Sequence, residues 1–297
     1  MIQKALALLL SIQLLFLAGC QQPVDATPTS RSQETPSPPA IQPPTFTPQG
    51  WLSATFSFSP PAPTATPTPA AAQAAAICSP LEDIRLDELS QPDLMKNPFE
   101  MPRPGFDDGH PGADFAYWSR GERKAMLGLG VNAVLAGRVA GIIQNRPPYG
   151  YAIIIETPLD SLPQAWLDRL QAPTPAPTLS PASNLICPPP TIGMVIPDER
   201  SLYLLYAHLN LPPELAISQQ VTCGQKIGEV GTTGRSVNPH LHLETRVGPA
   251  GASFTEMAHY DNGATENEMR NYCTWRVSGL YQLLDPLKVI QALSLQP

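Results

Sequence analysis

The sequence predicts a mostly β, antiparallel domain with long loop insertions, preceded by a disordered proline-rich tether. The chain of 297 residues contains 37 prolines, far above the usual level of about 5%, and most of them fall in two tracts. From Cys78 onward the composition becomes globular, and short apolar runs punctuated by glycines dominate over helical periodicity. These two observations divide the chain into segments and assign the fold class of the largest one.

Residues 1–20 have the features of a lipoprotein signal peptide. Lys4 precedes an apolar run over residues 5–17, which is too short to cross a membrane as a helix. The run ends in Leu-Ala-Gly-Cys at residues 17–20, which resembles the bacterial lipobox, in which the cysteine becomes the acylated first residue. An ordinary signal peptide with a chance cysteine is the alternative. We therefore expect an extracytoplasmic protein, held on the bacterial cell membrane through lipid on Cys20.

Residues 21–77 are rich in Pro, Thr, Ser, Ala and Gln and carry almost no charge. Such a segment cannot bury enough apolar surface to offset the entropy of ordering, which predicts a disordered linker.

Residues 78–297 remain, and they are sufficient for one domain with a hydrophobic core. The net charge of -7 argues against nucleic acid as a partner.

Within residues 78–297, the apolar runs predict strands over residues 133–136, 138–144, 151–157, 202–209, 226–230 and 240–247. Weak helical patterns cover residues 161–171, 265–272 and 287–293. A second proline-rich tract over residues 158–200 interrupts the β pattern and predicts an insertion. Because this tract connects strands near His208, we expect it to border the substrate groove.

Two pairs of side chains suggest a metal site. His110 and Asp114 are separated by a Pro-Gly-Ala segment that disfavours a helix, so their side chains must converge from a turn into a strand. His240 and His242 alternate with Glu244 along a strand-like run, and the period of two places all three on one face.

The chemistry of these residue types favours zinc. Two imidazoles and a carboxylate suit zinc better than calcium or magnesium, and three protein ligands leave a fourth position for water. The remaining histidines of the chain's motifs, including His208 at the end of its own apolar run, can move protons and stabilise an oxyanion. The sequence contains no His-Glu-x-x-His motif, so thermolysin-like chemistry is not supported.

Five short motifs occur in a fixed order along the chain. They are Gly-His-Pro-Gly-Ala-Asp at 109–114, Tyr-Ala-His-Leu at 206–209, Gly-Gln-Lys-Ile-Gly at 224–228, Gly-Thr-Thr-Gly-Arg-Ser at 231–236 and Pro-His-Leu-His-Leu-Glu at 239–244. In this order they closely resemble the lysostaphin-type metallopeptidases, which are peptidoglycan endopeptidases of β-rich fold. The resemblance covers about residues 110–247, with Asp-Pro at 285–286 resembling the family's usual ending.

The resemblance implies one zinc ion per chain, with His110, Asp114 and His242 as its ligands. It implies that His208 and His240 act as general base and oxyanion stabiliser. The expected activity is hydrolysis of peptide bonds in cell-wall peptidoglycan through a metal-activated water. Two alternatives stay open: a catalytically silent module that binds wall and activates other hydrolases, and a protease acting on proteins. The long segments at 158–200 and 248–284 depart from the family, so substrate specificity does not transfer.

Several polar residues lie outside these assignments. His259 falls outside every motif, which predicts a surface position or a supporting role rather than ligation. Glu244 could orient a histidine or be a solvated strand residue. The pair Asp107 and Asp108 is expected in a solvated turn, and Tyr206 in the core.

Four cysteines remain when Cys20 is set aside, and in an exported protein they predict two disulfides with three possible pairings. None belongs to a Cys-x-x-Cys motif, so a thiolate metal site is not expected. We favour Cys78 with Cys223, which would fix the end of the tether to the catalytic sheet. We favour Cys187 with Cys273, which would join the two segments that depart from the family.

Overall fold

The structure is a computed structural model that describes residues 75–177, 185–188 and 198–295. The predicted signal peptide, Cys20 and all but the last residues of the predicted tether lie outside this range. Among the described residues, no helix is both long enough and apolar enough to cross a membrane.

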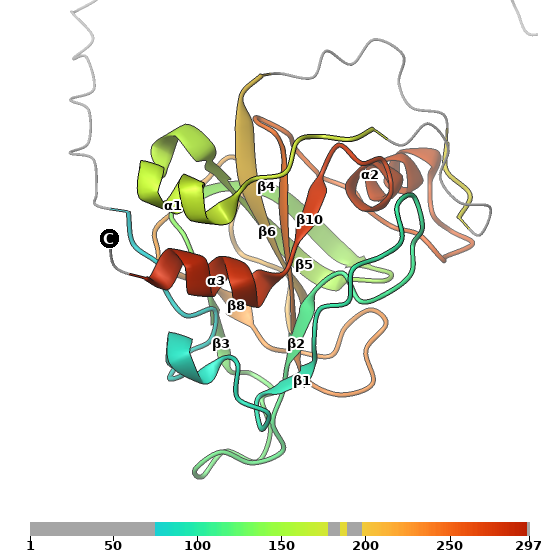
Figure 1. Cartoon of the computed structure of the whole chain (residues 1–297). Coiled ribbons are helices and arrows are strands. Elements are labelled where there is room, and N and C mark those ends of the chain that lie inside the picture. The colour runs from blue at the N-terminus through green and yellow to red at the C-terminus, as the bar shows by residue number, and fades with distance from the viewer. Residues whose placement is uncertain (1–74, 178–184, 189–197, 296–297) are drawn as a thin grey trace, which may run out of the picture. The chain divides into compact units, whose positions relative to one another are not determined.

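An eight-stranded sheet forms the centre of the domain (Figure 1), and the predicted mostly antiparallel β fold is confirmed. Its strands follow the order β1-β2-β9-β6-β5-β4-β7, and β10 also pairs with β9. A second sheet pairs β3 with β8. The strands are β1 Met95–Asn97, β2 Ala113–Phe115, β3 Gly130–Asn132, β4 Gly137–Arg146, β5 Gly150–Pro158, β6 Arg200–Leu209, β7 Gln220–Val221, β8 Lys226–Glu229, β9 Leu241–Pro249 and β10 Gln282–Leu284.

Both faces of the large sheet are buried, which explains the long apolar runs in its central strands. Along β5, Ile153 and Ile155 enter one core while Ala152 and Ile154 enter the other. Helices α1 (Gln164–Leu170) and α3 (Pro286–Ser294) cover the first face, and α2 (Glu266–Arg276) covers the second (Figure 1). Short 3₁₀ helices span Leu86–Glu88 and Leu159–Ser161.

The two longer helices have local start signals. Asp285 accepts hydrogen bonds from the backbone N–H groups of Leu287 and Lys288, and Pro286 occupies the first turn of α3. Thr265 and Glu268 form a reciprocal capping box at the start of α2. These caps satisfy backbone donors that the first helical turn leaves unpaired.

The structure contains both disulfides favoured from the sequence, Cys78–Cys223 and Cys187–Cys273. The first joins the start of the described chain to the turn between β7 and β8. The second joins the insertion after β5 to helix α2. Each bridge therefore links segments that no strand pairing connects.

One predicted strand, over residues 133–136, is wrong. These residues form a buried loop between β3 and β4. Their backbone groups are satisfied without a ladder: Ala133 exchanges hydrogen bonds with the 224–225 turn, and the Val134 N–H donates to the Tyr206 hydroxyl. Tyr206 is buried, as expected. An apolar run whose backbone groups find such partners needs no sheet.

The described residues of the 158–200 insertion do not border the cleft, which differs from the expectation for this segment. The insertion leaves β5 at Pro158 and returns at the start of β6, where Pro158 pairs with Ser201. His208 lies at the opposite end of β6, beside the pairing of Tyr151 with Leu209. Antiparallel strands place these two ends far apart, and no described residue of the insertion is among those that line the cleft around His208.

The 231–236 loop rests against the start of β5, and Gly150 makes this approach possible. Gly150 has a φ of +70°, and a Cβ there would lie 2.4 Å from the Thr233 carbonyl carbon. The Thr233 hydroxyl accepts a hydrogen bond from Tyr151 N–H and donates to the Leu209 carbonyl. The glycine thus lets one loop reach two neighbouring strands.

We expect Gly150→Ala to lower the free energy of unfolding by about 2–5 kcal/mol, since left-handed backbone strain and overpacking both contribute. Gly251→Ala is the matched control, because Gly251 has a φ of +79° and open space where a Cβ would stand. The control should lose only about 1–2 kcal/mol, the cost of the backbone alone. Denaturant unfolding with intact disulfides measures both, and equal losses would contradict the packing argument.

Candidate metal centre

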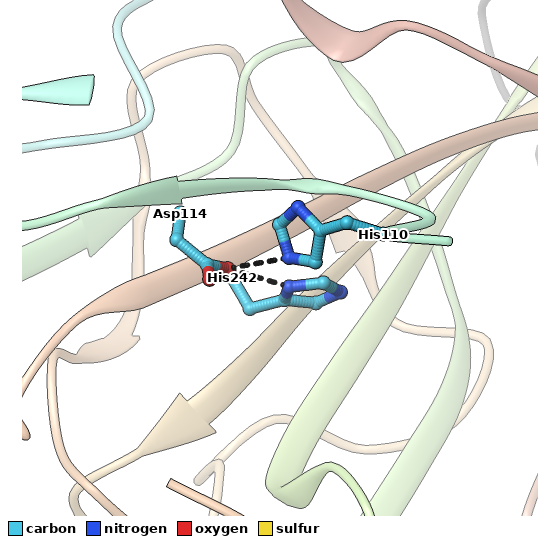
Figure 2. A group of neighbouring side chains, drawn as sticks. All are labelled: His110, Asp114 and His242. Carbon is cyan, nitrogen blue, oxygen red and sulfur yellow. Dashed lines mark hydrogen bonds and ion pairs between the residues drawn. The ribbon is translucent and has the colours of Figure 1, made fainter. Parts of the chain in front are cut away.

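Two neighbouring strands bring Asp114 and His242 face to face. Asp114 in β2 is the register partner of His242 in β9, and its Oδ1 lies 2.7 Å from Nδ1 of His242. His110 reaches the same oxygen from the loop before β2, with Nε2 at 3.1 Å (Figure 2). One nitrogen or oxygen from each residue lies within 4.8 Å of the others. The three residues therefore present their donor atoms to one point.

The turn that carries His110 can pass so close to β9 because residue 112 is glycine. A Cβ at Gly112 would lie 2.6 Å from Cε1 of His242. The backbone of His110 is held by two hydrogen bonds with Glu100, one in each direction. The local sequence thus fixes the approach of His110 while leaving space for the imidazole of His242.

Each of the three side chains is oriented by a second partner. Nδ1 of His110 lies 2.9 Å from the Pro98 carbonyl, so it carries the proton and donates. Nε2 of His242 lies 3.4 Å from Oε1 of Glu244. Oδ2 of Asp114 accepts a hydrogen bond of 3.1 Å from Asn97. Metal-binding histidines have this arrangement, with the outer nitrogen bound to a carbonyl or carboxylate and the inner one facing the ion.

The electrostatics of the group favour a positive charge next to Asp114. Burial alone would raise the pKa of Asp114, but hydrogen bonds from His110 and His242 outweigh it and hold that pKa well below its usual range. Burial likewise lowers the pKa of His242, whereas hydrogen bonds to Asp114 and Glu244 raise it to about 9. Surroundings that stabilise a proton there also stabilise a cation. Two imidazoles and a carboxylate are a donor set that fits zinc.

His240 and His208 lie beside the three-residue group without belonging to it. Nε2 of His240 is 3.7 Å from Oδ1 of Asp114, and the ring centroids of His208 and His240 are 4.7 Å apart. Nδ1 of His240 lies 2.8 Å from the Asn238 carbonyl, and Nδ1 of His208 lies 2.8 Å from the Thr233 carbonyl. Each ring can thus donate through Nδ1, and in the neutral form of either ring Nε2 is the acceptor nitrogen.

His208 owes its orientation to an irregularity in the sheet. Ile153 pairs with Tyr206 and Tyr151 with Leu209, so β6 has one more residue than β5 in this stretch. His208 has a φ of +61° within this bulge. Bulges of this kind turn a side chain out of the ladder and are frequent beside active sites. Burial and the neighbouring histidines lower the pKa of His208 to about 3, which keeps the ring neutral at pH 7.

All five residues line an open cleft of about 360 Å³. Its other lining residues come from β1 and the end of β2, from the turn before β5 and from the 235–238 segment: Lys96, Asn97, Ala116, Pro148, Tyr149, Arg235, Ser236, Val237 and Asn238. All five residues were candidates from the sequence, and the structure places all of them in one cleft.

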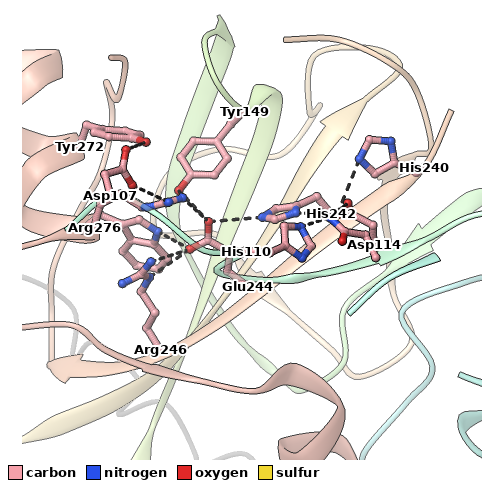
Figure 3. A network of polar contacts seen from close by, with 12 residues as sticks. Asp107, His110, Asp114, Tyr149, His240, His242, Glu244, Arg246, Tyr272 and Arg276 are labelled. Atoms are coloured by element: carbon pink, nitrogen blue, oxygen red, sulfur yellow. Dashed lines mark hydrogen bonds and ion pairs between the residues drawn. The ribbon is translucent and has the colours of Figure 1, made fainter. Parts of the chain in front are cut away.

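A buried network of polar side chains lies behind His242 (Figure 3). Glu244 is fully buried and contacts Tyr149 Oη at 2.7 Å, Trp275 Nε1 at 2.9 Å and Arg246 Nε at 3.0 Å. Arg276 at the end of α2 lies 3.3 Å from Glu244. Burial would raise the pKa of Glu244, but the charge of Arg246 and the hydrogen bond to His242 keep it well below its usual range. Of the two readings of Glu244, the structure excludes the solvated one.

The prediction that Asp107 lies in a solvated turn is wrong. Its side chain is 3% exposed, its Oδ1 lies 2.5 Å from Arg276, and Tyr272 donates a hydrogen bond to Oδ2. Asp108 does pair at the surface, with Arg103.

His259 is buried rather than at the surface, and it contacts the Ile186 carbonyl outside the metal group. Its burial makes the surface alternative wrong.

Sequence reasoning missed Asn97, Tyr149 and Arg276. None of the three lies in a motif, and each meets its partner across a long stretch of chain: 17 residues for Asn97 with Asp114, and 32 for Arg276 with Glu244. The capping box that starts α2 was the one local signal near Arg276, and it predicts only a helix.

One protein-family model matches part of this chain. Residues 192–254 match the model of peptidase family M23, a segment that contains His208, His240 and His242. A search of curated proteins found no match.

Solved structures show distant likeness. They include a zinc-containing peptidase from Vibrio cholerae (18% identity, 65% of this chain, 35% of that chain, TM-score 0.32). A second is a putative M23 peptidase from Pseudomonas aeruginosa (17% identity, 68% of this chain, 52% of that chain, TM-score 0.31). A third is the catalytic domain of lysostaphin from Staphylococcus simulans (17% identity, 65% of this chain, 89% of that chain, TM-score 0.33).

At such identities and TM-scores these structures inform neither the residues of the site nor their roles. The matched part of this chain spans about a third of the Vibrio peptidase and about half of the Pseudomonas one. Residues 192–254 thus match peptidase family M23, and the ordered motifs along the chain resemble the lysostaphin-type members of that family.

Proposed function

We propose that this chain is a zinc-dependent endopeptidase that hydrolyses peptide bonds of bacterial cell-wall peptidoglycan. The observation that carries the proposal is the convergence of His110, Asp114 and His242 on one point, with two further histidines beside them in an open cleft. One zinc ion per chain would be held by these three residues. Bound there, zinc would polarise a carbonyl group and lower the pKa of a water molecule to about 7.

The other two histidines supply proton chemistry. In the neutral rings of His208 and His240, Nε2 is the acceptor nitrogen, because each ring donates through Nδ1 to a backbone carbonyl. Either nitrogen can accept a proton from the attacking water. Once protonated, the same nitrogen can donate to the oxyanion or to the leaving amine. The carbonyls of Thr233 and Asn238 hold the two rings in the required tautomer.

A binding module without catalysis is the second candidate, and a protease that acts on proteins is a third. A binding module needs neither the shared orientation of three donor atoms nor the paired tautomers of His208 and His240. The complete set of five side chains therefore favours the enzyme. A zymogram with purified cell wall, run with and without a chelator, tests the proposal. The proposal is supported if the protein clears the wall, the chelator abolishes the clearing and added zinc restores it. It is opposed if the protein clears no wall preparation.

The ligand and proton-transfer roles can be separated by substitution. His242→Ala removes one of three ligands, so zinc content should fall by orders of magnitude and activity should be lost with it. His208→Ala and His240→Ala should keep close to one zinc per chain and lose about 10²–10⁴-fold in rate. Elemental analysis beside wall hydrolysis, at matched folding, measures both effects.

His259→Ala is the matched control, because His259 is a buried histidine outside the metal group. If folded, it should keep both zinc and activity. The assignment is wrong if His208→Ala or His240→Ala empties the site while His242→Ala leaves it filled.

Asn97 is a positioning residue for the metal site. Its amide donates to Oδ2 of Asp114, which leaves Oδ1 for the metal. Asn97→Ala should weaken zinc binding by about 10–100-fold, the usual cost of losing an outer partner of a ligand. Lys96→Ala, one residue away in β1, keeps that hydrogen bond and should leave zinc affinity unchanged. Competition with a chromogenic chelator gives the affinity, and equal values for wild type and Asn97→Ala would oppose this role.

We also propose that the protein works outside the cytoplasm, anchored through lipid on Cys20. The lipobox-like residues 17–20 and the two disulfides support this location. Cys20→Ala should move the protein from the membrane fraction to the soluble fraction. Mass spectrometry of the wild-type N-terminus should show cleavage before Cys20 and more than one acyl chain, because one chain gives only marginal binding. An unmodified, uncleaved N-terminus would refute the anchor.

A further inference from the structure

The charges that line the cleft are predominantly positive. Asp114 is the single carboxylate among the lining residues, whereas Lys96 in β1 and Arg235 in the loop before β9 are two positively charged side chains. The buried carboxylates behind the cleft, Glu244 and Asp107, are matched by Arg246 and Arg276. Once Asp114 is shared with a divalent metal, the cleft is positive in a chain whose net charge is -7. Such a cleft concentrates anionic groups of a substrate.

Arg235 is held in place rather than free to move. Its guanidinium stacks over the Tyr260 ring, 4.6 Å from the centroid, and one nitrogen donates to the Tyr260 carbonyl at 3.2 Å. Its backbone N–H donates to the Pro148 carbonyl. Tyr260 in turn donates its hydroxyl to Asp107, which pairs with Arg276 of the buried network. The position of the guanidinium is therefore set by the same network that supports His242.

Among the described residues, no carboxylate oxygen lies within 4.0 Å of a guanidinium nitrogen of Arg235. Arginines elsewhere in the domain do have one, for example Arg146 with Glu268 and Arg103 with Asp108. A stacked guanidinium keeps several N–H groups available, and its planar fork matches a carboxylate. A positioned arginine that lines the cleft and has no carboxylate partner among the described residues has the features of a ligand-binding group.

We propose that Arg235 determines substrate specificity by binding a free carboxylate on the peptide near the scissile bond. The favoured substrates are wall peptides that carry carboxylates in this region, rather than uncharged oligoglycine bridges or amidated peptides. This inference rests on the proposed function, because it concerns the same cleft.

The test uses the zinc-loaded, full-length protein and three soluble probes. These are a cross-linked stem-peptide dimer with free carboxylates, the same dimer with its carboxylates amidated, and an oligoglycine peptide. Isothermal titration gives Kd, and chromatography of the products gives kcat/KM. Wild type should favour the free acid over the amide by about tenfold, the scale of one charge-assisted hydrogen bond at an exposed site.

Arg235→Gln should remove this preference by weakening only the free-acid dimer, and Arg235→Lys should restore part of it as a charge without the fork. Arg85→Gln is the matched control, with the same change of charge at an exposed arginine paired with Asp87 outside the cleft. Zinc content should be the same in all variants, which shows that the metal site is intact.

The outcomes separate this inference from the proposed function. Cleavage without any preference, or a preference that survives in Arg235→Gln, overturns the carboxylate site and leaves the peptidase standing. Binding with a preference that Arg235→Gln removes, but without cleavage, supports the carboxylate site and opposes the peptidase. A protein that neither binds nor cleaves any of the three probes overturns both.

Discussion

The pairing of β2 with β9 is the constraint on which the rest of the site depends. It makes Asp114 the direct neighbour of His242, with 2.7 Å between the carboxylate oxygen and Nδ1. A shift of register by one residue would turn one side chain to the other face of the sheet and destroy the group. Leu241 and Leu243 oppose such a shift, because both are fully buried in the core on the face opposite to His242. Hydrophobic burial thus fixes the geometry of a polar site.

Burying polar groups behind the site requires that their charges be balanced. Glu244 and Asp107 are both removed from water, and each is paired with an arginine in addition to neutral donors. An unpaired carboxylate at either place would be strongly destabilising. The segment after β9 provides Arg276, Tyr272 and Trp275 for this purpose. This extension therefore completes the support of the candidate metal centre.

The same extension also shapes the rim of the cleft. Tyr260 holds the guanidinium of Arg235 by stacking and is itself held by Asp107. Helix α1 of the 158–200 insertion packs on α3, on the other face of the sheet from α2, and Cys187 of the insertion is bonded to Cys273 in α2. The two atypical segments thus differ in their roles: the segment after β9 contributes to the site, whereas helix α1 of the insertion covers the sheet away from the cleft.

The sequence by itself determined the β character of the domain and most of its strands and helices, and it named the five residues that share the cleft. These features are local: period-two burial, helix caps and short motifs are each contained in a few adjacent residues. The sequence allowed three pairings of the four cysteines. The two bridges that we favoured from the positions of the cysteines are the ones in the structure.

Only the tertiary structure decided that residues 133–136 form a loop, that the described residues of the insertion do not line the cleft, and that Asp107 and Glu244 are buried partners of arginines. It also revealed Asn97 and Arg235 as parts of the cleft. The physical reason is common to all of these: the groups that satisfy each backbone or side chain come from distant segments. A single polar residue carries no local sign of whether water or a buried partner will complete its hydrogen bonds.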